Sequence, residues 1–173
     1  MNDKRYAARH RARMSKALML QAQQNPENTD LNLGLPESLT GFDFNADCPW
    51  DKITRFYPEF KQLDTQQLEC RLPDLKSGQE ILFPKGIRSA ELRMDSFTVN
   101  PMKKTIQLNV LSTYTVEISL SQTTLPALWT FGIPADPAWL IVLGTLIFKS
   151  DFPQRTAGTS GSSTYLFAKS VVL

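Results

Sequence analysis

Hydrophobic and polar residues alternate most regularly between positions 105 and 120. Apolar side chains occupy even positions there, and polar side chains fill most of the odd ones. The apolar positions are Ile106, Leu108, Val110, Tyr114, Val116, Ile118 and Leu120. A period of two residues predicts a β-strand with one face in a core and the other in water. Leu111 breaks the alternation, which predicts a bulge at residues 111–113.

A second alternating segment precedes this strand. Residues 88–99 alternate through Ala90, Leu92 and Met94, and the pattern changes phase at Phe97. This change also suggests a bulge. Residues 100–104 read Asn-Pro-Met-Lys-Lys, which is typical of a turn. The two segments, 88–99 and 105–111, are therefore predicted to form a hairpin.

Two further strands are predicted near the C-terminus. Residues 138–148 are apolar at every position except Gly144 and Thr145, which favours a central strand covered on both faces. Residues 149–162 are rich in Gly, Ser and Thr and predict a connection. Residues 164–173 are then expected to close the chain as a strand that pairs with 138–148.

The N-terminal residues form a different kind of segment. Residues 6–24 are mostly good helix formers without Gly or Pro, and Asn25-Pro26 ends the pattern, so a helix is predicted. On this helix one stripe is basic and the adjoining face is largely apolar. The basic stripe holds Arg5, Arg9, Arg13 and Lys16, and the adjoining face holds Tyr6, Ala7, His10, Met14, Ala17 and Leu18. Residues 1–29 are interpreted as an arm and linker, and residues 30–173 as one β domain.

Shorter elements are expected between the arm and the hairpin. Residues 31–44 fit an entering strand and turn. Residues 49–56 follow an acidic cap, hold a proline in their first turn and predict a short helix that Pro58 ends. A further helical turn is possible at 65–70. The complete pattern predicts a mainly β protein, an antiparallel β-sandwich with an amphipathic N-terminal helix and one or two short helices, with a flattened β-barrel as the alternative.

The C-terminal half resembles a known but uncharacterised group of sequences. Residues 139–148, Trp-Leu-Ile-Val-Leu-Gly-Thr-Leu-Ile-Phe, are followed by a polar loop and a last strand, and Leu82-Phe83-Pro84 precedes the strand at 90–97. In these features the chain is similar to an uncharacterised family of Bacteroidetes proteins, from about Leu82 to its end. The resemblance implies an all-β body and no particular activity.

Composition and charge narrow the class of protein. The chain has 42% hydrophobic and 21% charged residues, as in folded globular proteins. Its longest apolar run, 138–148, is about half of the ~20 residues that a membrane-spanning helix needs. The basic start leads into Gln21, Gln23 and Gln24 rather than a hydrophobic stretch, so no signal peptide is expected. The compartment is unknown, with cytoplasmic synthesis or a virion as the expected settings.

Charge is distributed unevenly along the chain. Six of the 19 basic residues lie in the first 24 positions, where Asp3 is the one acidic residue, so the remaining residues hold 13 basic and 16 acidic side chains. A basic arm on a slightly acidic body indicates that the arm meets a partner. Cys48 and Cys70 are too few for a disulfide scaffold and are expected to be free thiols.

Catalytic chemistry finds little support in the sequence. His10 is the only histidine, so nucleophile-histidine mechanisms and a four-ligand zinc site both lack a histidine in the body. Paired carboxylates occur as Asp47 with Asp51 and as Glu91 with Asp95, which are expected to be surface groups, the second pair in cross-strand charge pairs with Arg93 between them. No catalytic residue, metal site or cofactor is predicted.

Two aromatic groups have alternative interpretations. Residues 50–60 hold Trp50, Phe56, Tyr57 and Phe60 with Arg55 between them. They can stack on a base or a sugar, but a plug over the open end of the sandwich is favoured. Trp129 and Phe131 lie in a Pro-rich segment and form a possible exposed interaction loop.

These observations predict a non-enzymatic structural or interaction module, a subunit of a larger assembly such as a virion or surface complex. The predicted partner-binding residues are Arg5, Arg9, Arg13, Lys16, Met14 and Leu18, which would dock the arm on another protein or on a second copy. A solvated helix without a partner is also compatible with the pattern. A nucleic-acid-associated protein that uses the arm is the alternative, and a carbohydrate-binding or carbohydrate-active β-sandwich is the third.

Overall fold

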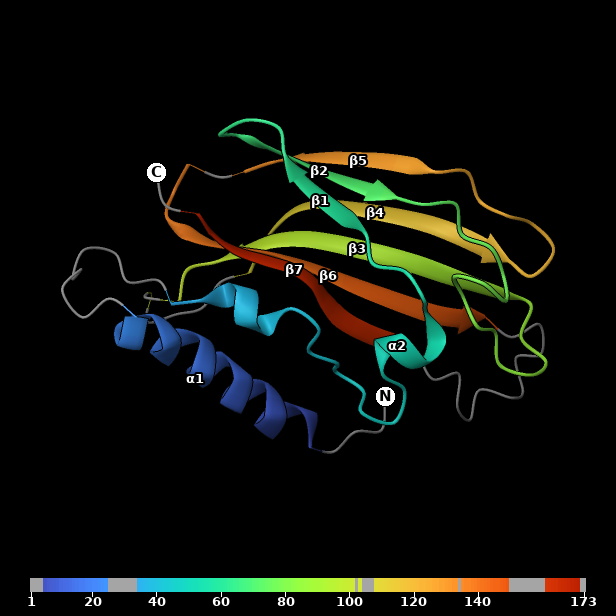
Figure 1. Ribbon diagram of the computed structural model, residues 1–173, viewed down its shortest axis with the longest axis horizontal. Helices are drawn as coiled ribbons and strands as arrows, with labels where there is room; N and C mark the ends of the chain where they lie inside the picture. Colours follow the sequence, from blue (N-terminus) through green and yellow to red (C-terminus); the bar gives the residue numbers. More distant parts are fainter. Residues whose placement is uncertain are drawn as a thin grey trace.

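A computed structural model shows that the protein consists of two β-sheets and a helical layer (Figure 1). The structure describes residues 5–24, 34–101, 103, 108–133, 135–149 and 161–171. Its helical elements are α1 (Tyr6–Gln24), the 3-10 turn η1 (Pro36–Leu39) and α2 (Trp50–Ile53). Its strands are β1 (Glu59–Gln62), β2 (Gln67–Leu72), β3 (Ser89–Val99), β4 (Asn109–Ser119), β5 (Ala127–Gly132), β6 (Ala138–Lys149) and β7 (Ser162–Val171).

The strands form two open antiparallel sheets. One has the order β1-β2-β5 and the other the order β4-β3-β6-β7. The predicted mainly β sandwich is confirmed, and the barrel alternative is wrong because the sheets do not close. The β3–β4 hairpin and the β6–β7 pair are also confirmed. β6 lies between β3 and β7, as expected of a central strand.

The predicted bulge in the hairpin lies on β4. Ser96 pairs with Ser112, whereas its neighbour Phe97 pairs with Val110. Leu111 is therefore the extra residue, within the segment that the sequence singled out. β3 pairs with β6 without any shift of register, so the phase change at Phe97 does not mark a bulge between these two strands.

A second bulge lies on β7. Val142 pairs with Phe167 and Leu143 pairs with Tyr165, which leaves Leu166 as the extra residue. Leu166 packs in the core between the sheets, while Tyr165 packs on the opposite face of the four-stranded sheet. Because successive side chains of a regular strand face opposite sides, the inserted residue is what lets Leu166 and its neighbour Phe167 both pack toward the core between the sheets.

The main core lies between the two sheets. It contains side chains of β2, β3, β5 and β6, together with α2. Trp50 is completely buried, its indole Nε1 donates to the Phe56 main-chain oxygen at 3.3 Å, and the two rings meet at an edge. Phe60 stacks on Phe167 with ring centroids 4.7 Å apart. Trp50 and Phe56 are therefore core residues, as the plug interpretation expected, rather than an exposed stacking surface.

A second core lies on the other face of the four-stranded sheet. There α1, η1 and the segment that follows η1 pack against β3, β6 and β7, on the side away from β1, β2 and β5 (Figure 1). Its buried residues are Ala17, Leu39, Phe42, Phe97, Val99, Trp139, Ile141, Tyr165 and Ala168. β6 is therefore covered on both faces, which explains its nearly uniform apolar sequence.

Two local predictions are wrong, and a third is confirmed only in part. Residues 65–70 do not form a helical turn, because β2 begins at Gln67 and pairs with β1 and β5. The described part of the predicted entering strand contains η1 instead, with one isolated bridge at Asp43. The short helix at 49–56 is confirmed in place but ends at Ile53, before Pro58, because Thr54 takes an extended conformation.

On the face of the four-stranded sheet that carries α1, the part that α1 leaves uncovered is charged. Lys149 on β6 pairs with Glu91 on β3 at 2.9 Å and also with Glu117 on β4. Arg93 pairs with Asp95 on the same strand at 2.9 Å. The expected cross-strand pairing is confirmed for Glu91, whereas Asp95 pairs within its own strand. Such exposed pairs contribute little stability each.

Both cysteines are free and buried, as expected. Burial raises the pKa of the Cys70 thiol to about 12. In the part of the chain that the structure describes, no helix has the length and apolar character needed to cross a membrane.

The thiols offer a direct check of this core. At pH 8 a thiol reagent is expected to label neither cysteine in the native protein, because the reactive thiolate of Cys70 is suppressed and both side chains are covered. In denaturant both are expected to react, which mass spectrometry counts. Fast labelling of Cys70 without denaturant would contradict its place in the core.

Candidate interaction site on the N-terminal helix

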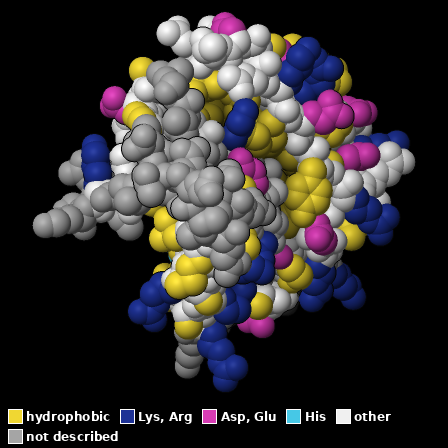
Figure 2. Space-filling model, turned by 60° about the vertical axis from the view of Figure 1, so that its left-hand side comes forward, with side chains coloured by type: hydrophobic (Ala, Val, Ile, Leu, Met, Phe, Trp, Pro, Cys, Tyr) yellow, Lys and Arg dark blue, Asp and Glu magenta, His cyan; other side chains and the backbone are white. Residues whose placement is uncertain are grey.

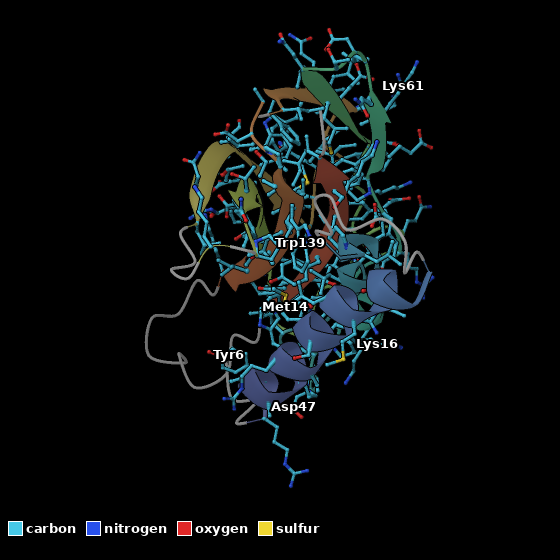
Figure 3. All side chains as sticks on the ribbon, turned by 90° about the vertical axis from the view of Figure 1, so that its left-hand side faces the viewer. Tyr6, Met14, Lys16, Asp47, Lys61 and Trp139 are labelled. Carbon is cyan, nitrogen blue, oxygen red and sulfur yellow. The ribbon has the colours of Figure 1, made fainter. Side chains whose placement is uncertain are left out.

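The helix α1 presents two different faces. Its sequence contains no acidic residue, and steps of three and four residues group its side chains along the axis. The inner face, which is buried or half-buried, consists of Arg9, His10, Arg13, Met14, Ala17 and Leu20. The outer face, which is exposed, consists of Arg5, Tyr6, Ala7, Ala8, Arg11, Ala12, Ser15, Lys16, Leu18 and Met19. In Figure 3, Met14 lies on the side of α1 toward the sheets and Lys16 on the side away from them.

The helix approaches the body most closely at Ala17. This side chain is completely buried, and its main-chain oxygen accepts a hydrogen bond from the Leu35 N–H at 2.7 Å. Gly34 has a φ of +81°, and a Cβ atom there would lie 2.8 Å from the Ala17 oxygen and 3.2 Å from Trp139 Cζ2. Two small residues thus allow the helix and the returning chain to touch through their backbones.

His10 holds the first half of the helix in an aromatic pocket. Its Nε2 is hydrogen-bonded to the Tyr165 hydroxyl at 2.8 Å. Its ring lies 5.3 Å from Phe42 and 5.4 Å from Phe44, measured between centroids. Burial lowers the pKa of His10 and raises the pKa of Tyr165 to about 12. The contact is therefore made by uncharged rings at neutral pH.

Arg9 is also used within the chain. Its guanidinium lies over the Phe42 ring, 5.3 Å from the centroid, and its Nη1 donates to the Asp43 main-chain oxygen at 3.1 Å. A cation above an aromatic face is attracted by the ring quadrupole. The stem and head of this arginine therefore help to fix α1 on the body.

The six residues predicted to bind a partner do not share one surface. Arg9, Arg13 and Met14 belong to the inner face, whereas Arg5, Lys16 and Leu18 belong to the outer face. Three of the six predicted partner-binding residues therefore face the protein's own body. Nothing in the sequence marks Phe42 and Tyr165 as the rings that receive Arg9 and His10, so this division was not predictable.

The predicted interaction loop at Trp129 and Phe131 is wrong. Both residues lie in strand β5, with 7% and 5% of their surface exposed, and pack in the core. The Trp129 indole donates to Ser112 Oγ on β4 at 3.0 Å. Leu128 and Thr130, which alternate with them, face solvent instead.

The outer face combines charge with exposed apolar surface. Met19 is 65% exposed, Tyr6 43% and Leu18 39%. Toward the lower end of Figure 2, Lys and Arg side chains predominate and hydrophobic side chains lie among them. Basic and apolar groups on one rigid helix can bind an acidic surface that also offers apolar contacts.

Three hollows elsewhere lack the groups that catalysis would need. The largest, about 530 Å³, lies beside Lys103 and Asp136, and a cleft of about 180 Å³ lies beside Lys169. The third, about 250 Å³, has Glu117 as its one carboxylate. None of the three combines two carboxylates. Among the described residues no three His, Cys, Asp or Glu side chains are grouped so as to hold a metal ion.

Comparison with known proteins returned no relatives. No family matches the chain, and neither the curated proteins nor the solved structures include a match. The resemblance of the C-terminal half to the Bacteroidetes family therefore stays a prediction. The outer face of α1 is the surface of the described chain that best combines exposure, charge and rigidity.

Proposed function

We propose that the protein is a non-enzymatic assembly subunit that binds a second copy of itself through the outer face of α1. The observation that carries this proposal is the fixation of α1 by its inner face. Because Ala17, His10 and Arg9 hold the helix on the body, its outer side chains are ordered before any partner arrives.

Such ordering lowers the cost of binding. Most of the stability of a helix in a protein comes from tertiary packing, so a partner that had to fold α1 would lose binding free energy to conformational entropy. The docked helix has already met this cost through its contacts with the body. Its basic and apolar side chains are thus presented as a rigid ridge.

Charge complementarity favours a second copy as the partner. The first 24 residues hold six basic side chains and one acidic one, whereas the rest of the chain holds 13 basic and 16 acidic ones. The arm of one copy therefore attracts the body of another. A contact between two different surfaces is head-to-tail and builds rings or filaments, as a subunit of a virion or a surface complex would.

Nucleic acid is the weaker candidate. Arg9 and Arg13 lie on the inner face, so the described outer face offers Arg5, Arg11 and Lys16 to phosphates. Three phosphate contacts correspond to a salt slope of about −3, which gives weak, sequence-independent attachment. Carbohydrate stacking is also less favoured, because Trp50 and Phe56 are buried.

The test is the mass of the full chain by size exclusion with light scattering at low and high salt. The double substitution Leu18→Asp and Met19→Asp reverses the character of the outer face without touching the inner face. The wild-type chain is expected to form a discrete oligomer or a polymer that weakens at high salt. The double variant is expected to be monomeric.

A matched variant controls for the added charge. Leu63 and Leu125 are also exposed but lie outside α1, so Leu63→Asp with Leu125→Asp adds the same two charges elsewhere. This variant is expected to assemble like the wild type. A wild-type chain that is monomeric at every salt concentration, or a control variant that dissociates equally, would overturn self-assembly through α1.

A further inference from the structure

We propose that His10 is a pH-sensitive latch, and that its protonation in mild acid releases α1 from the body. The proposal begins from the pocket around the imidazole. Phe42 and Phe44 come from the segment after η1, and Tyr165 comes from β7; all three rings lie within 5.8 Å of His10 between centroids. One hydrogen bond, to the Tyr165 hydroxyl, joins the ring to the sheet.

Burial opposes a positive charge on His10. On α1 itself, Arg9 precedes the histidine and Arg13 follows one turn later, and both lie on the inner face. The acidic groups on η1, on the segment after it and on β7 are Glu37, Asp47 and Asp43, and of these Asp43 interacts with Arg9. Its carboxylate accepts the Trp50 backbone N–H at 2.8 Å. In the described chain no carboxylate forms an ion pair with His10.

The aromatic rings around His10 do not compensate for the burial of a positive charge there. Rings can stabilise a cation, but the guanidinium of Arg9 already lies over Phe42. Tyr165 keeps its proton across the physiological range, because burial raises its pKa to about 12, so it brings no negative charge. An imidazolium here would add a second cation, next to the Arg9 guanidinium, to a half-buried aromatic contact.

The direction of the pH effect follows from linkage. Burial lowers the pKa of His10 from its ordinary 6.5 in the docked helix, so the released arm binds the proton more tightly. Above pH 6.5 both forms are neutral and docking has its full strength. As the pH falls below 6.5, docking weakens by about tenfold per pH unit, until the pH passes the pKa of the docked form.

Asp43 cannot produce the same response. Burial is the largest effect on its pKa and raises it, so the folded form of this carboxyl binds its proton more tightly than the unfolded form. Acid therefore favours the folded state through Asp43, the opposite sign to His10. A weakening of docking between pH 6.5 and 5 would point to the histidine.

Release would regulate the proposed function. This step rests on the proposal that the outer face of α1 binds a second copy: once the helix leaves the body, Leu18, Met19 and Lys16 are no longer held as a rigid ridge. Assembly is then expected to disappear over the same pH range in which docking is lost.

The experiment measures docking and assembly separately. Amide exchange of the full chain, at a concentration low enough to keep it monomeric, gives protection factors for α1 and β6 at pH 7.5 and 5.0. Protection in α1 is expected to fall in acid while β6 stays protected. In His10→Gln, whose amide can still reach the Tyr165 hydroxyl, α1 protection is expected to be equal at both pH values.

Two results of this experiment would overturn the latch. Equal wild-type protection of α1 at the two pH values contradicts it, and so does an equal loss in His10→Gln. If α1 fails to dock in both His10→Gln and His10→Phe, the pKa of His10 is measured in the wild-type chain by nuclear magnetic resonance. A value below 6.5 supports the latch, and a value at or above 6.5 overturns it. Light scattering at pH 7.5 and 5.0 then separates the two proposals, since lost docking with unchanged assembly leaves the latch standing and removes the assembly role of α1.

Discussion

Gly144→Ala is expected to lower the free energy of unfolding by about 2–3 kcal/mol, the upper part of the range for adding a methyl group to a filled core. A Cβ atom at Gly144 would lie 2.5 Å from Leu166 Cδ1, 2.8 Å from Leu166 Cγ and 3.3 Å from Trp50 Cη2. Leu166 is the bulge residue and Trp50 is fully buried, so neither can move far. Urea denaturation followed by tryptophan fluorescence measures the loss.

Gly132→Ala is the matched control. Gly132 also lies in a strand, but an added Cβ would meet its nearest atom at 3.9 Å, so its effect is expected to be within about 0.5 kcal/mol of zero. The double variant Gly144→Ala with Leu166→Ala should lose less than the two single losses added together, because removing the leucine side chain makes room for the new methyl. Additive losses would show that the two residues do not compete for space.

Ala17→Leu is expected to detach α1 while the β-sandwich stays folded. Ala17 is fully buried where the helix meets Gly34 and Leu35 through backbone atoms. A larger side chain cannot enter this contact without separating the helix from the body, which costs about 1–3 kcal/mol. Amide exchange is expected to show lost protection in α1 and retained protection in β6.

Ala12→Leu provides the comparison for this result. It makes the same chemical change on the same helix, but Ala12 is exposed on the outer face, so α1 is expected to stay protected. Retained protection in Ala17→Leu would mean that the backbone contact at Gly34 adjusts easily. Loss of protection in both variants would mean that leucine disturbs the helix itself rather than its docking.

The strands that were predictable from the sequence are the long ones. Over many residues, either apolar and polar positions alternate or nearly every position is apolar. β3, β4 and β6 each have 11 or 12 residues, long enough for a period of two residues, or its absence, to be visible. β2 has only six residues, and its Gln, Leu and Glu are good helix formers. Its pairing with β1 and β5 decides its conformation, and that pairing is not local information.

The candidate site was predictable only in part. The helix and its basic character follow from local composition, so α1 was located at its observed bounds. Which side of α1 turns inward depends on Phe42 and Tyr165, which lie far along the chain and receive Arg9 and His10. Arginine can bury its stem and still satisfy its head, so the basic stripe could not be assumed to face solvent.

Strand β6 is shared by the two cores, because from Trp139 to Leu143 one of its faces lines the core beneath α1 and the other lines the core between the sheets. Trp139 belongs to one core and its neighbour Leu140 to the other. A change in side-chain volume at either residue shifts a backbone that both cores press against. Repacking one layer of this protein therefore requires adjusting the other.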